Sequence, residues 1–356
     1  MYLPHNRHAM MDLDLFLEIL GIDSSSSKEG TLSEFLIRRL PVSGCEVNVY
    51  MADTVPEQGD GTCPAPSNIL LSWGEPRIVF CTHYDTVPPY IPPVVEKRDD
   101  GQTVIRGRGA CDAKGQLFSM YNACLRLAER GEEGVGLLLL YGEETGSLGA
   151  KDFRNKYPGG EYVIVGEPTD NRMVSASKGT KSFAVTVKGK SFHSGYPVYG
   201  ASAVERFVDM MNALRAVDFP MDPMLGETTW NVGRLVSDNP QNILSDRLTF
   251  RIYFRTTFAS DRMVCEVMDG FKDEYIDVEA FGGDTPAGYL TLDGFGTKTV
   301  AFGSDAPQLT NFRHKALCGP GSILVAHTDG EYILLGDMEQ ATENYIRMFE
   351  ELKRRL

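Results

Sequence analysis

The sequence predicts an α/β protein in which a main domain is interrupted by a second, smaller domain. Two observations carry this prediction. In the first and last parts of the chain, short apolar segments alternate with helical segments, which is the pattern of a mostly parallel sheet covered by helices. Between residues 178 and 286, strand segments instead alternate polar and apolar residues. Their order with two helices is β-α-β-β-α-β, a ferredoxin-like unit.

The N-terminal part of the chain supplies helices first and then buried strands. Residues 1–10 are set aside as a flexible leader. A helix is expected from Met11 through "DLDLFLEILGI", and a second, amphipathic helix over residues 32–40. "PRIVFC" is a strand that ends near Cys81, and "AKGQLFSMYNACLRLAERGE" is a helix. "GLLLLYG" and "EYVIVG" are two further strands.

The inserted segment reads as six elements in a row. They are strand "TKSFAVTVKG", helix "ASAVERFVDMMNALRAV", strands "TTWNVGRLV" and "DRLTFRIYFRTT", helix "SDRMVCEVMDGFK" and strand "IDVEAFGG". The first pattern then returns, with strands expected in "KTVAFGSDAP" and "SILVAHTDGEY" and a helix in "MEQATENYIRMFEELKRR". We therefore expect one domain from residues 1–177 and 287–356, and a second from residues 178–286.

Composition argues against several classes of function. The 356 residues carry a formal net charge of −14, and binding to nucleic acid or to an anionic membrane needs basic surface instead. The seven cysteines form no C-x-x-C pair, as expected for free thiols in a reducing compartment. No apolar stretch approaches the roughly 20 residues that span a bilayer, and we identify no secretory signal. The sequence predicts a cytoplasmic protein with a small-molecule partner and neither nucleic-acid nor membrane partners.

Histidine and carboxylate side chains stand at the points where the expected strands end. His83 and Asp85 follow "IVFCT", Glu143 and Glu144 follow "LLLLYG", Glu167 follows "YVIVG", His327 follows "ILVA", and Asp112 stands directly before a helix. Ligands of open α/β sheets bind outside the carboxyl ends of the strands. Several carboxylates gathered there would repel one another unless cations lay between them, and the two imidazoles could bind the same cations. The pattern therefore predicts a site for divalent metal ions.

Each of these residues alone has a simpler explanation. A single histidine after a strand is usually only hydrogen-bonded, a glutamate pair at a strand end is usually solvated, and Asp112 before a helix is typical of an N-cap. The joint pattern is harder to attribute to chance. Other chemistries fit less well, because "GRGACDAKG" lacks the third glycine of a dinucleotide fingerprint and the chain has no G-x-S-x-G elbow. Cys81 and Cys111 are interpreted as packing residues without an assigned base.

Six motifs together resemble those of the two-zinc aminoacylase and carboxypeptidase family. They are "THYDTVPP", "GRGACDAKGQ", "GEETGSLGA", "GEPT", "GKSFHSG" and "AHTDGEYI", in the order seen in that family and over nearly the whole chain. The family includes acetylornithine deacetylase, succinyl-diaminopimelate desuccinylase and carboxypeptidase G. The resemblance implies a metallopeptidase-type catalytic domain, with residues 178–286 as an inserted lid through which a homodimer can form.

The same resemblance implies two divalent metal ions that share Asp112. His83 and Glu167 would complete one metal position, and Glu144 and His327 would complete the other. Zinc suits this mixture of imidazole and carboxylate ligands, although cobalt or manganese would also bind.

Three further residues would act in catalysis by resemblance. Glu143 would be the general base that deprotonates the attacking water and later protonates the leaving amine. Asp85 would hydrogen-bond the far nitrogen of the His83 ring and fix its tautomer. His193 matches a histidine that reaches the partner subunit's site in dimeric relatives and stabilises the oxyanion. The simpler alternative is that His193 is a polar surface residue at the end of a strand.

Substrate-binding residues are also implied. Asn242 in "QNILSD" and Arg255 in "IYFRTT" match positions that bind a substrate carboxylate, a task that suits the forked guanidinium group. The family usually has a proline shortly after this asparagine, which is absent here. The alternative for Arg255 is an ion pair with a neighbouring acid. Gly303 and Ser304 in "FGSDAP" would line the substrate pocket.

The resemblance favours hydrolysis of the amide bond of an N-acyl amino acid. Acetylornithine deacetylase, an enzyme of arginine biosynthesis, is the favoured type because the lid is compact and "GEPT" followed by "SASKG" resembles that branch. An exopeptidase for di- or tripeptides with the same metal chemistry is the alternative. A non-catalytic binding protein on this fold would have lost a ligand or the base, and this chain retains all of them.

Overall fold

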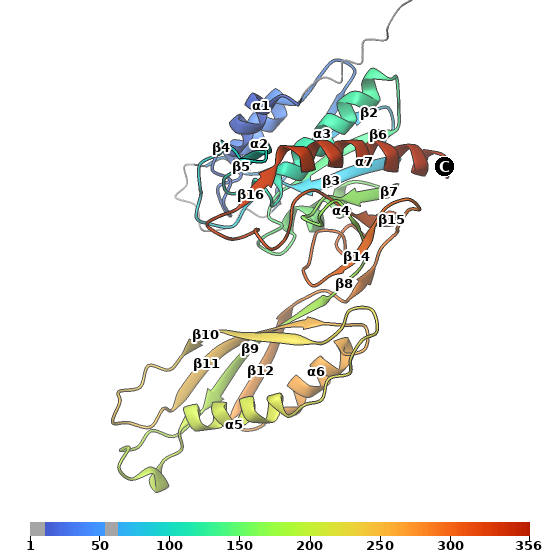
Figure 1. Cartoon of the computed structure of the whole chain (residues 1–356). Coiled ribbons are helices and arrows are strands. Elements are labelled where there is room, and N and C mark those ends of the chain that lie inside the picture. The colour runs from blue at the N-terminus through green and yellow to red at the C-terminus, as the bar shows by residue number, and fades with distance from the viewer. Residues whose placement is uncertain (1–10, 54–62) are drawn as a thin grey trace, which may run out of the picture. The chain divides into compact units, whose positions relative to one another are not determined.

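The structure, a computed structural model, describes residues 11–53 and 63–356, so the expected leader of residues 1–10 lies outside the described residues. The chain folds as two compact units (Figure 1). The first contains the chain up to Ser175 together with residues 289–298 and 304–356. The second contains residues 176–288 and a short return over 299–303, where the sequence had suggested 178–286.

A six-stranded sheet in the order β1-β2-β6-β3-β7-β15 lies at the centre of the first unit. Its strands are β1 (Glu46–Met51), β2 (Ser67–Trp73), β3 (Ile78–His83), β6 (Val135–Leu140), β7 (Gly160–Val165) and β15 (Phe312–Leu317). The four strands from β6 to β15 are parallel, while β1 and β2 are added antiparallel. The predicted α/β class is confirmed, and two strands in antiparallel pairing extend the parallel sheet at one edge.

Helices cover this sheet and explain why its central strands are apolar runs. They are α1 (Leu13–Leu20), α2 (Gly30–Arg39), α3 (Lys114–Glu129), α4 (Leu148–Lys156) and α7 (Leu335–Lys353). One hydrophobic cluster joins α1, α2, α3 and α7 to sheet residues such as Phe80, Leu137 and Ile164. Every residue of β3 and β6 is buried, as expected for parallel strands that are covered on both faces.

Two small three-stranded sheets lie outside the six-stranded sheet of the first unit and the four-stranded sheet of the second. One is antiparallel and consists of β4 (Val94–Lys97), β5 (Thr103–Arg106) and β16 (Tyr332–Leu334). The other consists of β13 (Ala287–Gly288), β8 (Met173–Ser177) and β14 (Thr297–Val300). No helix in the described part of the chain is both long and apolar enough to cross a bilayer.

The C-terminal strands differ from those expected. "SILVA" is not a strand, because it lies in a turn after Pro320 and its Leu324 is 84% exposed. The place beside β7 belongs instead to β15, whose sequence "FRHKAL" reads as polar; a strand at the edge of a sheet tolerates such side chains. "KTVAFG" yields only the short strand β14, which pairs outside the central sheet.

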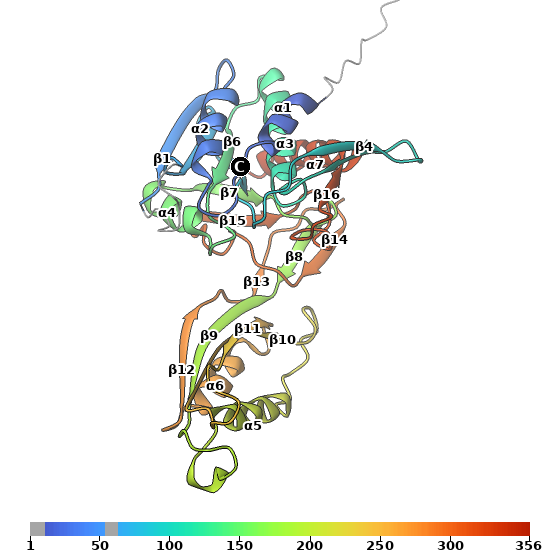
Figure 2. The ribbon, with the colours of Figure 1, turned by 90° about the vertical axis from the view of Figure 1, so that its left-hand side faces the viewer.

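The second unit is an antiparallel sheet with two helices. Its elements are β9 (Gly179–Lys188), the short 3-10 helix η1 (Pro197–Tyr199), α5 (Ala203–Arg215), β10 (Thr229–Val236), β11 (Arg247–Thr256), α6 (Asp261–Gly270) and β12 (Ile276–Gly282). The strand order is β10-β11-β9-β12, and both helices cover the same face (Figure 2). Alternate residues of β11, including Phe250 and Phe254, pack against α5 and α6 in a separate core. The predicted β-α-β-β-α-β order is present.

Candidate metal centre

Three neighbouring parallel strands bring the site residues to one edge of the central sheet. His83, the last residue of β3, pairs with Leu140, the last residue of β6, and β7 ends at Val165 opposite Cys81. The strands thus end nearly level. Residues two to four positions beyond β6 and β7, which include Glu144 and Glu167, must therefore surround His83.

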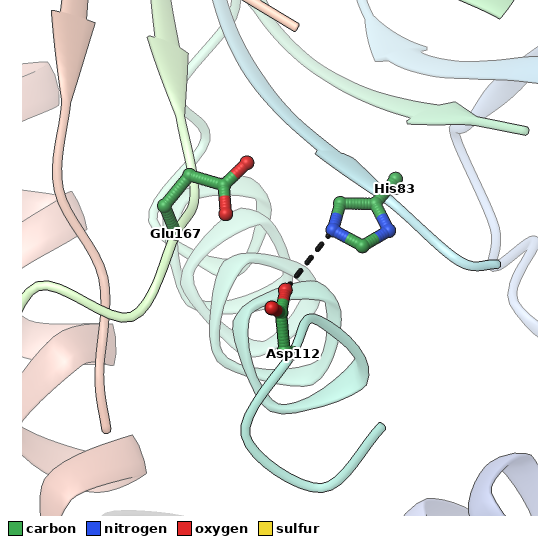
Figure 3. Close-up of side chains that lie close together, drawn as sticks. All are labelled: His83, Asp112 and Glu167. Carbon is green, nitrogen blue, oxygen red and sulfur yellow. Dashed lines mark hydrogen bonds and ion pairs between the residues drawn. The ribbon is translucent and has the colours of Figure 1, made fainter. Parts of the chain in front are cut away.

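Asp112 lies between two imidazoles. It does not cap α3, since the N-cap residue is Ala113 and no side chain caps that helix. Instead, Asp112 Oδ1 lies 3.2 Å from His83 Nε2, an interaction drawn as a dashed line in Figure 3, and Oδ2 lies 3.3 Å from His327 Nε2. Each carboxylate oxygen therefore faces a different histidine, which is the arrangement expected of a carboxylate shared by two cations.

Two groups of potential metal ligands meet at Asp112. They are His83, Asp112 and Glu167, and Asp112, Glu144 and His327; within each group the donor atoms lie within 4.8 Å of one another. The first group is buried, while His327 is about half exposed in the second. The structure thus assembles all five residues expected to hold metal.

His327 enters the site from a turn and not from a strand end. Its backbone has a positive φ of 62°, a conformation in which histidine is over-represented among non-glycine residues. Its Nε2 lies 2.9 Å from Glu144 Oε1. Hydrogen bonds to Asp112 and Glu144 raise the pKa of His327 to about 10, so a metal ion at this position would have to displace a proton.

The donor set fits divalent cations. Glu167 is 4% exposed, and its Oε1 is a buried oxygen without a hydrogen-bond partner. Burial raises the pKa of Glu167 well above its usual range, and the nearby Asp112 carboxylate adds to this effect. A buried carboxylate oxygen is costly unless a donor or cation satisfies it. Imidazole nitrogens and carboxylate oxygens together are typical ligands of zinc and related metals.

The main chain fixes the tautomer of His83. Its Nδ1 lies 3.0 Å from the backbone carbonyl oxygen of Asp85 and 3.4 Å from that residue's Oδ1. A carbonyl oxygen can only accept, so Nδ1 carries the proton and Nε2 is left free to bind metal. Sequence reasoning had given this hydrogen bond to the Asp85 carboxylate alone.

The Asp85 carboxylate has a second partner that sequence reasoning missed. Its two oxygens accept hydrogen bonds from the backbone N–H groups of Glu143 and Glu144, both at 3.0 Å. Asp85 is fully buried, so water does not compete for these bonds. One carboxylate therefore positions both His83 and the turn that carries the paired glutamates.

Glu143 lies in an environment that favours its protonated form. Burial raises the pKa of Glu143 well above its usual range; the charge of His83 opposes this, while Asp305 and Glu144 reinforce it. Asp305, which sequence reasoning also missed, is 1% exposed, and burial raises its pKa to about 7. It stands in "FGSDAP" directly after Ser304, and nothing in this sequence indicates that its side chain is buried near the candidate metal site.

Cys81 and Cys111 are unsuited to nucleophilic catalysis. Both are buried, and burial raises the pKa of each thiol well above its usual range. A thiol in that state is protonated at neutral pH and reacts poorly. Their interpretation as packing residues agrees with these surroundings.

The expected substrate residues are not all brought together. His193 and Asn242 are neighbours in the second unit, where Ser194 N donates to Asn242 O at 2.9 Å. Arg255 lies at the opposite end of β11, about 25 Å further along the strand at about 3.3 Å per residue. Within one chain, Asn242 and Arg255 therefore cannot contact the same carboxylate.

Arg255 and the pocket residues have local partners. The Arg255 guanidinium lies over the Tyr253 ring, 4.8 Å from its centre, and no described contact pairs it with an acid. Ser304 is buried and its Oγ accepts a hydrogen bond from Ala306 N at 3.3 Å. Gly303 ends the return segment of the second unit.

Solved structures with similar folds include a tripeptidase, a metallo-carboxypeptidase and an amidase. A tripeptidase from Staphylococcus aureus has a TM-score of 0.78 at 19% identity, covering 96% of this chain and 98% of that one. An M20 family metallo-carboxypeptidase from Sulfolobus solfataricus has a TM-score of 0.69 at 17% identity, covering 94% and 97%. At these identities the similarity shows the fold.

Sequence comparison shows the family. A "Probable carboxypeptidase" from Uncinocarpus reesii is 31% identical over 380 residues, covering 94% of this chain and 85% of the relative. Another from Aspergillus oryzae is 34% identical over 310 residues, covering 77% and 74%. The family model described as Peptidase family M20/M25/M40 matches residues 79–351. This chain therefore belongs to Peptidase family M20/M25/M40 and is a metal-dependent hydrolase.

Proposed function

We propose that this chain is a two-metal exopeptidase that removes the C-terminal residue from short peptides. The observation that carries the proposal is the description of its relatives, which at 31% and 34% identity over most of the chain are "Probable carboxypeptidase" proteins. The sequence had favoured an acetylornithine deacetylase of arginine biosynthesis. No comparison supports that choice, and the exopeptidase alternative is the better supported. A cytoplasmic location, inferred from the free cysteines, is part of the proposal.

The two ligand groups define the proposed metal positions. His83, Asp112 and Glu167 hold one divalent ion, and Asp112, Glu144 and His327 hold the other. We propose zinc, with cobalt and manganese as competitors. When bound, such ions lower the pKa of water and polarise the scissile carbonyl.

Glu143 moves the proton in this proposal. It takes a proton from the water whose oxygen attacks the peptide carbonyl carbon, and it gives that proton to the nitrogen as the C–N bond breaks. Burial raises the pKa of Glu143, which makes its carboxylate a stronger proton acceptor than an exposed glutamate. Asp85 keeps the Glu143 backbone fixed, so the carboxyl group is presented from an ordered turn.

Matched substrates test whether the enzyme removes residues from the C-terminus or the N-terminus of a peptide. We expect an N-blocked dipeptide with a free C-terminal carboxylate to be hydrolysed by zinc- or cobalt-loaded protein, and the same dipeptide with a C-terminal amide to resist. Release of amino acid is measured by chromatography, with N-acetylornithine as the deacylase substrate. A dipeptide amide with a free N-terminus is the third substrate, and cleavage of its peptide bond would indicate an aminopeptidase. Preference for N-acetylornithine would restore the deacylase.

Glu143→Gln should slow catalysis strongly and spare the metals. Replacing the carboxyl group by an amide removes the proton acceptor, so we expect kcat to fall by about 10²–10⁴-fold. Metal content, measured by atomic emission, should stay at the wild-type value. Glu144→Gln is the matched control and should lose one metal. If Glu143→Gln stays folded but loses metal, the two glutamates have been assigned the wrong way round.

His193 is proposed to complete the site of a second copy of the chain. The experiment is to co-express His193→Ala and Glu143→Gln chains. Each homodimer is inactive, but a mixed dimer holds one site with an intact Glu143 and an intact partner histidine. Random pairing should restore about a quarter of wild-type turnover. No recovery in a verified mixed dimer, or a fully active His193→Ala protein, would contradict this role.

The metal-free protein should lose stability as pH rises from about 4 to about 7. The pKa of Asp305 is about 7 in the folded protein and 3.8 ordinarily, so between these values only the folded chain holds the proton. Raising the pH through this window therefore destabilises the fold, by up to about 4 kcal/mol for one such group. Glu167 shifts in the same direction.

Urea unfolding with a chelator at pH 5 and pH 7 measures this slope. Asp305→Asn should flatten it. Because metal ions replace protons on their ligands, the stabilisation from added zinc should grow over the same window. A metal-free protein whose unfolding free energy is constant or rises with pH would show that these carboxyls ionise normally.

A further inference from the structure

We propose that the buried ion pair of Arg108 and Glu331 is a positioning device that sets the metal centre. It joins the turn that carries Asp112 to the turn that carries His327. Neither Arg108 nor Glu331 is a metal ligand in the proposed function, on which this inference rests. Both side chains are 2% exposed or less, so their interactions are made within the protein.

Glu331 holds the backbone of the Asp112 turn. Its Oε1 accepts hydrogen bonds from the backbone N–H groups of Cys111 and Asp112, both at 3.0 Å. Its Oε2 accepts from Arg108 Nη1 at 2.7 Å. Both oxygens of the carboxylate are therefore engaged by one short segment, and the main chain at Asp112 has little freedom to rotate.

Arg108 extends this arrangement to the His327 turn. Its Nη1 also donates to the carbonyl oxygen of Thr328, the residue after His327, at 3.2 Å, and its Nε donates to the carbonyl oxygen of Pro89 at 3.2 Å. The backbone adds a bond from Glu331 N to Thr328 O at 3.3 Å. The guanidinium therefore joins its own turn to the segment at Pro89 and to the turn that contains Thr328 and Glu331.

The two metal positions depend unequally on this pair. Asp112 and His327 are two of the three ligands at the second position, and both lie on segments held by Arg108 and Glu331. At the first position only Asp112 lies on such a segment, because His83 ends strand β3 and Glu167 follows strand β7, which the sheet itself holds in register. Loosening the pair should therefore weaken the second position more than the first.

A purely stabilising role explains the pair poorly. Burying two charges costs desolvation that their attraction only partly offsets, so apolar replacements are often as stable. The two N–H groups of the Asp112 turn, in contrast, need an acceptor at this place. A carboxylate with a forked cation behind it meets that geometric requirement.

The test is metal titration of Glu331→Gln and Arg108→Lys proteins after chelation. The glutamine presents N–H groups to Arg108, and lysine keeps the charge but cannot span three acceptors. Zinc binding is followed by calorimetry and by competition with a chromophoric chelator. His327→Ala identifies which binding step belongs to the second position. Leu352→Ala, a buried truncation at the far end of α7, is the control for loss of stability alone.

We expect the second-position step to weaken by about 10–100-fold in both variants, as is typical when residues behind metal ligands are changed. The first step should weaken less than the second, because only Asp112 among its ligands lies on a segment held by the pair, and Leu352→Ala should change neither step. Equal weakening of both steps, or steps unchanged from wild type, would overturn the proposal. If Glu331→Gln does not fold, Arg108→Lys decides. Wild-type protein that binds fewer than two metals would instead overturn the proposed function itself.

Discussion

The structure depends on one electrostatic constraint, which is that carboxylates cannot gather at the ends of buried strands without cations. Glu144 and Glu167 follow the two parallel strands on either side of β3, and Asp112 lies between two imidazoles, with one oxygen toward each. The rigid sheet prevents these groups from moving apart. Imidazolium protons can neutralise part of the charge, and divalent ions can neutralise more of it. The same arrangement therefore makes the metal-free fold sensitive to pH and the site receptive to metal.

The same local device is used twice around this centre. Asp85 accepts hydrogen bonds from two consecutive backbone N–H groups, those of Glu143 and Glu144. Glu331 likewise accepts hydrogen bonds from the backbone N–H groups of Cys111 and Asp112. In each case a buried carboxylate that binds no metal in our proposal fixes a turn that carries functional groups. Because ligand positions must be correct within a fraction of an ångström, turns held in this way have an advantage over free loops.

Much of this could be predicted from the sequence because the central strands are buried on both faces and leave an apolar run, which locates the residues at their ends. The edge strand β15 was missed because its exposed edge permits Arg313 and Lys315. His327 was predicted as a ligand and lies beside Asp112 and Glu144, but it was wrongly placed after a strand. Arg108 was not predicted, since a motif shows which residues are present but not that a charged side chain is buried. Its role depends on partners more than 200 residues away.

The metal centre alone does not select a substrate. Peptides and N-acyl amino acids both present an amide beside a free carboxylate, and in our proposal the metals and Glu143 act only on the amide. Selection therefore falls to groups that contact the rest of the substrate. Asn242 precedes the start of β11 and Arg255 lies near its end, so they cannot form one carboxylate pocket within a chain. If both contact substrate, they either bind separate parts of it or serve the sites of two different copies, and Asn242 then acts together with its neighbour His193.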